Sequence, residues 1–299
     1  MTEFSQVDVN DFLETSVQKL NIYLATVFAQ NSEPQKLFDA MRYSLLAPGK
    51  RLRPALCLAV AQTLGVAEDD VISVAAALEL VHAYSLIHDD LPAMDNDDLR
   101  RGQPTNHNVF GEATALLAGD GLLTHAFTLL SQPRSFLHPE QQLELVLCLA
   151  VAAGPYGMVG GQQADLAAET QRPDISMLRF IHTHKTAALI EAAVVMGAIV
   201  GGATSEQRTL LASYGRHLGL AFQIVDDLLD VTATTQELGK SAGADERQHK
   251  MTYPAAVGVA ETRKMADDEL AQALTSLTGV GLHTSLLVGL AKMSVRRIH

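Results

Sequence analysis

Apolar residues recur at helical spacing along almost the whole chain. Side chains on one face of an α-helix lie three or four positions apart, whereas a half-buried strand alternates apolar and polar residues. No stretch sustains that alternation, so the predicted fold class is all-α. The spacing predicts helices over residues 5–30, 35–46, 52–64, 71–91, 111–131, 139–169 (interrupted near Pro155), 174–201, 206–232, 251–276 and 283–297.

The length and composition are typical of a globular protein with a large core. The chain has 299 residues, of which 47% are hydrophobic and 19% charged. The predicted connections are short, and no low-complexity linker or internal repeat divides the chain, so residues 1–299 are expected to form a single large helical bundle. The formal net charge of −12 argues against nucleic acid as a partner, because proteins that bind its phosphate backbone carry a basic surface.

The sequence predicts a cytoplasmic protein. No basic, signal-like segment precedes an apolar stretch at the N-terminus. Cys57 and Cys148 both lie in apolar helical patterns, which is typical of reduced, buried thiols. The longest apolar run, Ala187 to Ala203, is short for a membrane span and contains Glu191, so a buried helix is expected and no membrane span.

Five aspartates occupy the ten positions from Asp89 to Asp98, where a predicted apolar helix ends. Asp89 and Asp95 are six residues apart, and on a regular helix they would point to different sides. Pro92 lacks the N–H of a regular turn, and its ring crowds the preceding one, so the helix should end or kink there. We therefore expect Asp95 to turn back toward Asp89.

A second acidic cluster lies in "FQIVDDLLD", where Asp226 and Asp230 are four residues apart on one helical face. Clustered carboxylates suit a hard cation, and Mg²⁺ takes one or two of them and fills its other positions with water and substrate phosphate. Alternatively, the first cluster is a solvated acidic loop and the second a polar helix edge, but two such clusters on two apolar helices favour metal sites. The candidate ligands of Mg²⁺, of which more than one ion is expected, are Asp89, Asp90, Asp95, Asp226 and Asp230.

Basic residues accompany the first cluster. Arg100 and Arg101 follow it directly, and arginine can bind a phosphate through two hydrogen bonds. In "APGKRLRPAL", Lys50 and Arg53 surround a predicted helix N-terminus, whose free N–H groups favour an anion; a basic surface turn is the alternative. His82 precedes Asp89 by seven residues and so shares nearly the same helical stripe, which favours ligand contact over a plain core histidine.

Two lysines extend this electrostatic pattern. Lys185 opens the most apolar helix of the chain, where an ammonium group needs a partner or a route to water. Lys240 lies in the glycine-containing stretch 234–248, a candidate mobile loop, and it could close over a bound anion or simply be solvated.

The motifs in this chain resemble those of the bacterial short-chain isoprenyl diphosphate synthases, in particular the farnesyl diphosphate synthases (geranyltranstransferases). The matching stretches run in order from residue 49 to residue 245: "GKRLRP", "LIHDDLPAMDNDDLRRGQPT", "GGQQADL", "HKTAALI", "AFQIVDDLLD" and "LGKSAGAD". Each is unspecific alone, but six in this order and spacing are specific. The resemblance implies an all-α bundle around a deep central cavity, usually as a homodimer.

The resemblance also implies roles for individual residues. Asp89, Asp95 and Asp226 would hold Mg²⁺ against an allylic diphosphate, with Asp230 assisting through water. Arg100, Lys185 and Lys240 would contact that diphosphate. The diphosphate of isopentenyl diphosphate would be held by Lys50, Arg53, His82 and Arg101. Thr186 and Gln223 match positions beside the reacting carbons, and Phe222 could stabilise positive charge with its ring face or simply belong to the core.

In such enzymes the bulk of side chains before the first aspartate motif sets the product length. Tyr84, the fifth residue before Asp89, is followed by Ser85, and a large ring there resembles the enzymes with fifteen-carbon products. On an ideal helix Ser85 lies on the same side as Asp89, whereas Tyr84 is rotated by roughly 140° about the helix axis from Asp89. Tyr84 therefore forms the cavity floor only if the cavity is broad or the helix bends.

The expected reaction joins isopentenyl diphosphate to dimethylallyl or geranyl diphosphate and gives farnesyl diphosphate. A geranylgeranyl diphosphate synthase is the alternative within the same family. Three further alternatives are a class I terpene cyclase, a non-catalytic subunit of a heteromeric synthase and a helical scaffold. Lys50, Arg53 and His82 argue against the cyclase, which needs no second diphosphate site, and the two intact acidic clusters argue against a degenerate subunit.

Overall fold

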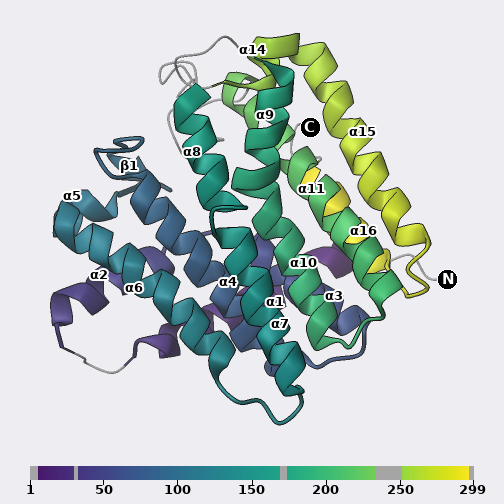
Figure 1. The fold of residues 1–299 in the computed structure, drawn as a ribbon, viewed down its shortest axis with the longest axis horizontal. Coiled ribbons are helices and arrows are strands. Elements are labelled where there is room, and N and C mark those ends of the chain that lie inside the picture. The colour runs from purple at the N-terminus through teal and green to yellow at the C-terminus, as the bar shows by residue number, and fades with distance from the viewer. Residues whose placement is uncertain (1–5, 30–32, 169–173, 233–250, 296–299) are drawn as a thin grey trace.

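The computed structural model describes residues 6–29, 33–168, 174–232 and 251–295. Helices dominate this part of the chain, which confirms the predicted all-α class (Figure 1). They are α1 (Gln6–Val27), α2 (Gln35–Leu45), α3 (Leu52–Thr63), α4 (Glu68–Asp89), α5 (Asn106–Phe110), α6 (Glu112–Ser131), α7 (Pro139–Ala153), α8 (Met158–Ala168), α9 (Ile175–His182), the π-helical segment η1 (Thr183–Ala187), α10 (Ala188–Val200), α11 (Ser205–Thr232), α14 (Tyr253–Val257), α15 (Val259–Thr278) and α16 (Ser285–Val295).

The predicted helices differ from the observed ones mainly by internal breaks. The expected interruption near Pro155 separates α7 from α8. The range 251–276 divides into α14 and α15 at Gly258, which has a φ of 82° that favours glycine. Sequence analysis missed α5 and an antiparallel hairpin of two short strands, β1 (Leu99–Arg100) and β2 (Gln103–Pro104).

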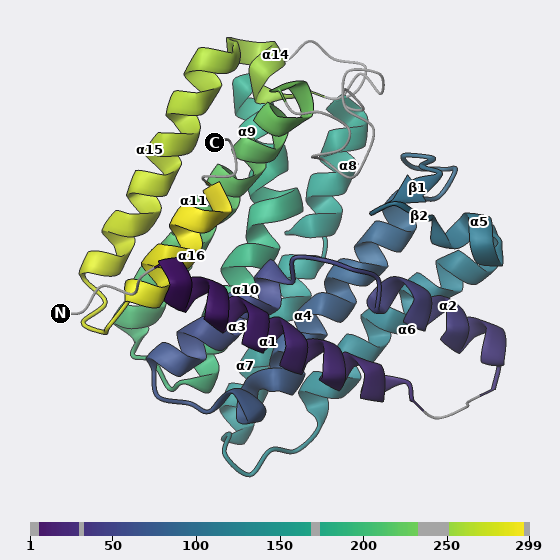
Figure 2. The ribbon, with the colours of Figure 1, turned by 180° about the vertical axis from the view of Figure 1, so that it is seen from behind.

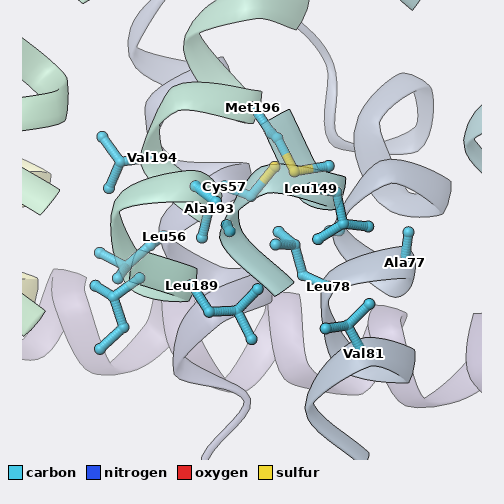
Figure 3. Packing of buried hydrophobic residues seen from close by; sticks show 14 of the residues in the cluster. Leu56, Cys57, Ala77, Leu78, Val81, Leu149, Leu189, Ala193, Val194 and Met196 are labelled. Carbon is cyan, nitrogen blue, oxygen red and sulfur yellow. The ribbon is translucent and has the colours of Figure 1, made fainter. Parts of the chain in front are cut away.

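Helix α4 lies in the interior because it is apolar on almost every side. From Val71 to Val81 its apolar side chains are buried, apart from the partly buried Ile72. It packs against α3 and α6, and α3 in turn packs against α10, which lies beside α11. In this core Cys57 meets side chains of α4, α7 and α10, including Leu78, Leu149 and Met196 (Figure 3).

The outer helices enclose this core from several directions. Helix α15 runs alongside α11, and α1 crosses α3 and α4 obliquely on the face seen in Figure 2. One cluster of buried hydrophobic side chains extends from Val9 in α1 to Val295 in α16. The described parts of both ends of the chain therefore contribute to the same core.

Four helical stretches are long and apolar enough to cross a membrane, judged by length and composition alone: Glu68–Asp89, Glu112–Ser131, Pro139–Ala168 and Ile175–Val200. In the first, 72% of the apolar window is buried inside the fold, and in the last 61%, so core packing accounts for much of their apolar character. The window within Pro139–Ala168, which spans α7 and α8, is only 33% buried. Apolar side chains on α6 and α7 are therefore exposed on the surface of this chain.

Candidate active site

A cavity of about 1520 Å³ opens between the segment before α3, the C-terminal half of α4, the β1–β2 hairpin, α8, η1 and α11. It brings together side chains from both halves of the chain. The residues singled out in the sequence that line it are Lys50, Arg53, His82, Tyr84, Ser85, Asp89, Arg100, Arg101, Lys185, Thr186, Phe222, Gln223 and Asp226.

The first acidic cluster follows the end of α4. The helix ends at Asp89, and the backbone N–H of Asp95 donates a 2.9 Å hydrogen bond to the Asp89 carbonyl oxygen. Asn96, with a φ of 51°, donates its N–H to the Leu91 carbonyl. The chain thus turns back after Pro92, as the sequence predicted, and Asp95 lies beside Asp89, whose side chain lines the cavity.

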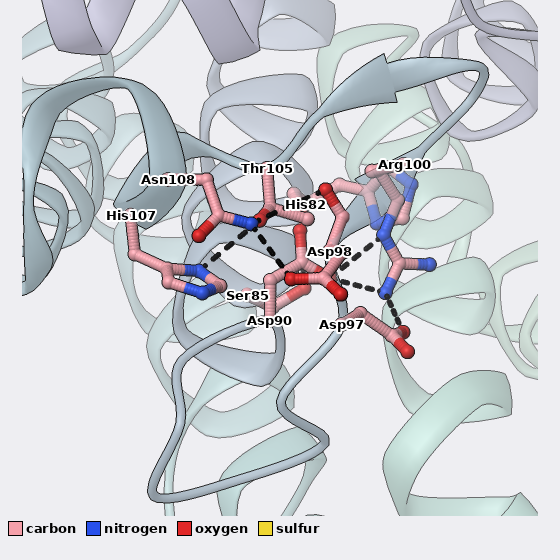
Figure 4. Close-up of polar contacts among 9 residues, drawn as sticks. All are labelled: His82, Ser85, Asp90, Asp97, Asp98, Arg100, Thr105, His107 and Asn108. Carbon is pink, nitrogen blue, oxygen red and sulfur yellow. Dashed lines mark hydrogen bonds and ion pairs between the residues drawn. The ribbon is translucent and has the colours of Figure 1, made fainter.

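Asp90 has a different environment from Asp89. It is buried, it is not in the cavity lining, and its Oδ1 accepts hydrogen bonds from Nε and Nη2 of Arg100, which also bonds Asp97 (Figure 4). Burial raises the pKa of the Asp90 carboxyl against the opposing effect of Arg100. Burial also opposes the charge on Arg100, but the bond and charge of Asp90 outweigh it and raise the pKa of that guanidinium. The predicted metal ligand Asp90 therefore holds Arg100 instead.

The same cavity is also lined by basic residues. Lys50, Arg53 and Arg101 line it together with His82. Burial lowers the pKa of Arg53 to about 10, and burial and the surrounding arginines lower the pKa of His82 well below its usual value. Arg53 remains charged near neutral pH while His82 is neutral, so the positive charge here comes from lysine and arginine.

Arg51 fixes the backbone of this basic segment. Its side chain pairs with Glu79 of α4 inside the protein, and its Nη2 donates to the carbonyl oxygens of Leu45 and Ala47. Its φ of 48° lies in the left-handed region, a conformation that needs such tertiary support in a residue other than glycine. Arg51 borders the cavity together with Lys50 and Arg53, but its guanidinium is committed to these internal partners and so has a structural role.

The second acidic cluster divides between the cavity and the interior. Asp226 lines the cavity, whereas Asp227 and Asp230 are buried, at 3% and 2% exposure. The four-residue spacing of Asp226 and Asp230 therefore does not give the two carboxylates the same exposure to the cavity. Among the side chains that the structure describes, no group of three or more His, Cys, Asp or Glu residues is placed to hold a metal ion by itself.

The π-helical segment η1 presents Lys185 and Thr186 to the cavity. Lys185 Nζ lies 2.5 Å from Asp165 Oδ2 on α8, the partner that its apolar surroundings required. Glycines let the neighbouring helices approach this turn: a Cβ on Gly161 would lie 2.2 Å from the Lys185 backbone nitrogen, and one on Gly219 would lie 2.6 Å from Cα of Ala187. Single π turns are frequent at functional sites, and this one positions two cavity side chains.

A chain of hydrogen bonds extends from Thr186 into the interior. The Thr186 hydroxyl donates to Gln223 Oε1 at 2.8 Å, and Gln223 Nε2 donates to Asp227 Oδ1 at 3.2 Å. The other carboxylate oxygen of Asp227 accepts the backbone N–H of Tyr253 at 3.0 Å. Both cavity side chains, Thr186 and Gln223, are therefore connected to the start of α14.

Tyr84 and Ser85 both line the cavity, although they lie on different sides of an ideal helix. Helix α4 is continuous to Asp89, so a broad cavity, and not a break before the aspartates, reaches both residues. The Tyr84 ring is 5% exposed and packs edge-on against His88, with ring centroids 5.6 Å apart. Burial and the charge of Asp89 raise the pKa of Tyr84 to about 12, so its hydroxyl is neutral near pH 7.

Two predictions lie outside the described residues. They are Lys240 and the candidate loop 234–248.

A family model described as polyprenyl synthetase matches residues 34–279, which is most of the chain. The chain belongs to the polyprenyl synthetase family. A farnesyl diphosphate synthase of Geobacillus stearothermophilus is 43% identical to it over 296 residues, which cover 99% of this chain and 100% of that one. Geranylgeranyl pyrophosphate synthase 3 of Arabidopsis thaliana, a chloroplastic protein, is 51% identical over 251 residues, which cover 83% of this chain and 70% of that one.

Solved structures agree with this polyprenyl synthetase assignment. An FPP/GFPP synthase from Zymomonas mobilis superposes with a TM-score of 0.85 at 37% identity, covering 97% of this chain and 100% of that one. A geranyltransferase from Helicobacter pylori, complexed with magnesium and isoprenyl diphosphate, superposes with a TM-score of 0.84 at 32% identity, covering 100% and 99%. The fold is the all-α fold of the isoprenyl diphosphate synthases, and the chain is a trans-prenyltransferase by family.

Sequence reasoning assigned no role to three polar residues around this polyprenyl synthetase site. Glu79 pairs with Arg51, Asp165 pairs with Lys185, and Asp227 accepts from Gln223. A signal existed for Glu79, because a lone carboxylate within an apolar helical stretch requires a buried partner. Asp165 and Asp227 stand in mixed polar surroundings in the sequence, and only the folded chain shows what they contact.

Proposed function

We propose that this polyprenyl synthetase condenses isopentenyl diphosphate with dimethylallyl or geranyl diphosphate to give farnesyl diphosphate. The observation that carries the proposal is a single cavity whose lining includes a carboxylate from each acidic cluster, Asp89 and Asp226, and a basic group formed by Lys50, Arg53 and Arg101. Two diphosphates need separate binding groups, and apolar residues in the same lining, including Met158, Leu166 and Phe222, suit the hydrocarbon chains.

The residues present fit Mg²⁺ as a cofactor. Asp89 and Asp226 come from different helices and line the same space, and Asp95 lies beside Asp89. Because no described group of three such side chains stands ready for a metal, water and substrate phosphate must complete the coordination shell, as is typical of Mg²⁺. Asp89, Asp95 and Asp226 would hold the ions, whereas Asp230, expected from the resemblance to assist through water, is buried and outside the cavity lining. Bound Mg²⁺ supplies charge neutralisation for the departing diphosphate.

The chain's own residues account for the other requirements of the reaction. Arg100 and Lys185, together with Lys240, are assigned to the allylic diphosphate, where they bind its oxygens as charge develops on them. Lys50, Arg53, Arg101 and His82 are assigned to the diphosphate of isopentenyl diphosphate.

Thr186 and Gln223 line the same cavity and are assigned to the reacting carbons. After the allylic carbon–oxygen bond breaks, the double bond of isopentenyl diphosphate attacks the allylic cation, and a proton leaves. The released diphosphate is the acceptor we favour for that proton. Phe222 in the same lining can place its ring face near the positive charge.

The fifteen-carbon product rests on Tyr84. Its buried ring lines the cavity next to His88 on the helix that carries Asp89, where it can stop a growing chain. The relatives include both farnesyl and geranylgeranyl diphosphate synthases, so the comparisons leave the length open. A twenty-carbon product is the second candidate, because a geranylgeranyl pyrophosphate synthase is among the similar proteins.

One assay tests the proposal. The pure protein is incubated with Mg²⁺, isopentenyl diphosphate and geranyl diphosphate, and the products are identified by mass after removal of the diphosphate. Farnesol supports the proposal and geranylgeraniol supports the second candidate. A cyclic hydrocarbon would instead indicate a cyclase, and no product would indicate a subunit or scaffold. Omitting Mg²⁺ should abolish turnover.

We further infer a homodimer. Helix α7 exposes Leu143, Leu147 and Val151, at 68%, 61% and 49%, spaced four residues apart on one face. On the neighbouring α6, Leu116 and Leu117 are 46% and 56% exposed. Contiguous apolar surface of this kind is typical of a protein–protein interface, and a second copy of the chain is the partner we propose. Two free cysteines, Cys57 and Cys148, support a reducing, cytoplasmic location, and the shared core supports one domain over residues 1–299.

A further inference from the structure

Asp227, in the second acidic cluster, is connected to two cavity residues through hydrogen bonds. It is 3% exposed and does not line the cavity, whereas its neighbour Asp226 does. Each of its carboxylate oxygens accepts a hydrogen bond, Oδ1 from Gln223 and Oδ2 from the backbone of Tyr253. His182 also lies close, with Nε2 3.8 Å from Oδ2. These contacts suit a residue that orients its neighbours and not one that binds a metal in the cavity.

The chemistry of a carboxylate determines the direction of the whole hydrogen-bond chain. An ionised carboxylate can only accept, so the Gln223 amide must turn its NH₂ group toward Asp227. The amide oxygen then faces Thr186, whose hydroxyl must donate to it. With its proton committed, the Thr186 oxygen has only lone pairs left for the cavity.

This direction matters for the proposed reaction. An oxygen lone pair near an allylic cation stabilises it, whereas a hydroxyl proton pointing at the cation opposes it, and such preorganised dipoles are a large part of enzymatic catalysis. We propose that Asp227 is a positioning residue: it fixes the amide orientation of Gln223 and thereby makes both Gln223 and Thr186 present oxygen lone pairs to the reacting carbons. The inference rests on the function proposed above.

Asp227→Asn tests the proposal with little change in volume. Tyr253 N–H still needs an acceptor, so the oxygen of the new amide should face it and the new NH₂ group should face Gln223. The Gln223 amide then flips, and the Thr186 hydroxyl accepts from it and turns its proton toward the cavity. We expect kcat to fall about tenfold or more. The KM for isopentenyl diphosphate and the Mg²⁺ concentration for half-maximal rate should stay within about twofold, because Lys50, Arg53, Asp89 and Asp226 are untouched.

A second substitution should restore the original direction. In Asp227→Asn/Gln223→Glu the carboxylate moves one position along the hydrogen-bond chain, accepts from the NH₂ group of the new amide and again accepts from Thr186. We expect this double variant to recover most of the kcat that each single variant loses, because Gln223→Glu alone sets two carboxylates against each other. Glu191→Gln, which removes a half-buried carboxylate paired with Arg216 between α10 and α11, is the matched control and should keep full activity.

Each result of these experiments either supports the positioning role of Asp227 or overturns it. An unchanged kcat in Asp227→Asn overturns the proposal, as does a loss that extra Mg²⁺ restores, which would make Asp227 a metal ligand. Failure of the double variant to exceed both single variants also overturns it, and so does failure of both proteins that carry Asp227→Asn to fold by circular dichroism. Absence of product from the wild-type chain would sink the proposed function itself, whereas wild-type turnover with an insensitive Asp227→Asn would sink only this inference.

Discussion

At the scale of single residues, neighbours in one motif have different tasks. Asp89 lines the cavity while the buried Asp90 holds Arg100, and Arg51, which lies between Lys50 and Arg53, is buried and pairs with Glu79. Consecutive residues of one short motif therefore differ both in exposure and in function. A motif assigned as a whole to metal or phosphate binding would give Asp90 and Arg51 the wrong role.

Tyr84 gives a prediction at this scale. Replacing its buried ring with a methyl group in Tyr84→Ala should lengthen the cavity beyond Asp89 and shift the products toward twenty carbons or more. The measurement is the product distribution by mass spectrometry. Tyr84→Phe keeps the ring that packs against His88 and should leave the distribution unchanged. A Tyr84→Ala protein that still stops at fifteen carbons would contradict the assignment of Tyr84 as the cavity floor.

At the scale of elements, the site depends on how closely helices approach η1. Helix α8 can lie against this π turn because residue 161 is glycine, and α11 can do so because residue 219 is glycine. The contact places Asp165 of α8 beside Lys185 and Gln223 of α11 beside Thr186. Small residues in two helices thus determine the geometry of polar groups on a third element.

Gly161→Ala tests this close approach. The added Cβ would lie 2.2 Å from the Lys185 backbone nitrogen, so α8 or η1 must shift. A displacement on the order of 1 Å should lower kcat/KM by about tenfold to a hundredfold. Gly121→Ala in α6 is the matched control, because its Cβ would meet only the flexible Met41 side chain, at 3.1 Å. Equal steady-state kinetics for the two variants would show that the approach of α8 does not matter.

The elements also show what the sequence could and could not predict. Helical periodicity predicted the main helices, and the chemistry of Pro92 predicted the turn that brings Asp95 back to Asp89. The hairpin was missed because two residues per strand are too few to alternate, and η1 because one five-residue turn is too short to be distinguished from a regular helix by its apolar spacing. The pairing of Lys185 with Asp165 depends on contact between helices, which one-dimensional spacing does not contain.

At the scale of the whole molecule, buried ionisable groups make stability depend on pH. Burial lowers the pKa of His182 from its ordinary 6.5 to about 3. Between pH 6.5 and pH 3, His182 binds a proton in the unfolded chain but not in the folded chain. Its contribution to the free energy of unfolding is therefore complete above pH 6.5 and is lost as the pH falls toward 3. His82, whose pKa is also lowered, acts in the same direction.

Between pH 7 and pH 5, His182 alone should lower the free energy of unfolding by about 2 kcal/mol. Urea unfolding midpoints at the two pH values measure the effect. His182→Gln should show a smaller loss between pH 7 and pH 5 than the wild type, whatever its stability at pH 7. His283→Gln changes an exposed histidine and should keep the wild-type pH dependence. Equal losses in the wild type and His182→Gln would show that another group is responsible.

The proposed dimer belongs to the same scale. Leu147→Glu places a charge in the exposed apolar stripe of α7 and should convert the protein to monomers, as measured by sedimentation velocity. Ile22→Glu changes an equally exposed side chain on α1, at 62% exposure, and should leave the assembly unchanged. A wild-type chain that sediments as a monomer would refute the proposed interface.

The ion pairs of Arg100 with Asp90 and of Lys185 with Asp165 have a consequence for selectivity. Both cations are already neutralised by the protein's own counter-ions before any ligand arrives. A singly charged anion such as chloride or acetate gains little free energy by displacing the carboxylates of Asp90 and Asp165, since each cation then only exchanges one anionic partner for another. Only a multivalent anion that brings its own cations can compensate for the exchange, so the pocket resists the abundant small electrolytes of the cell.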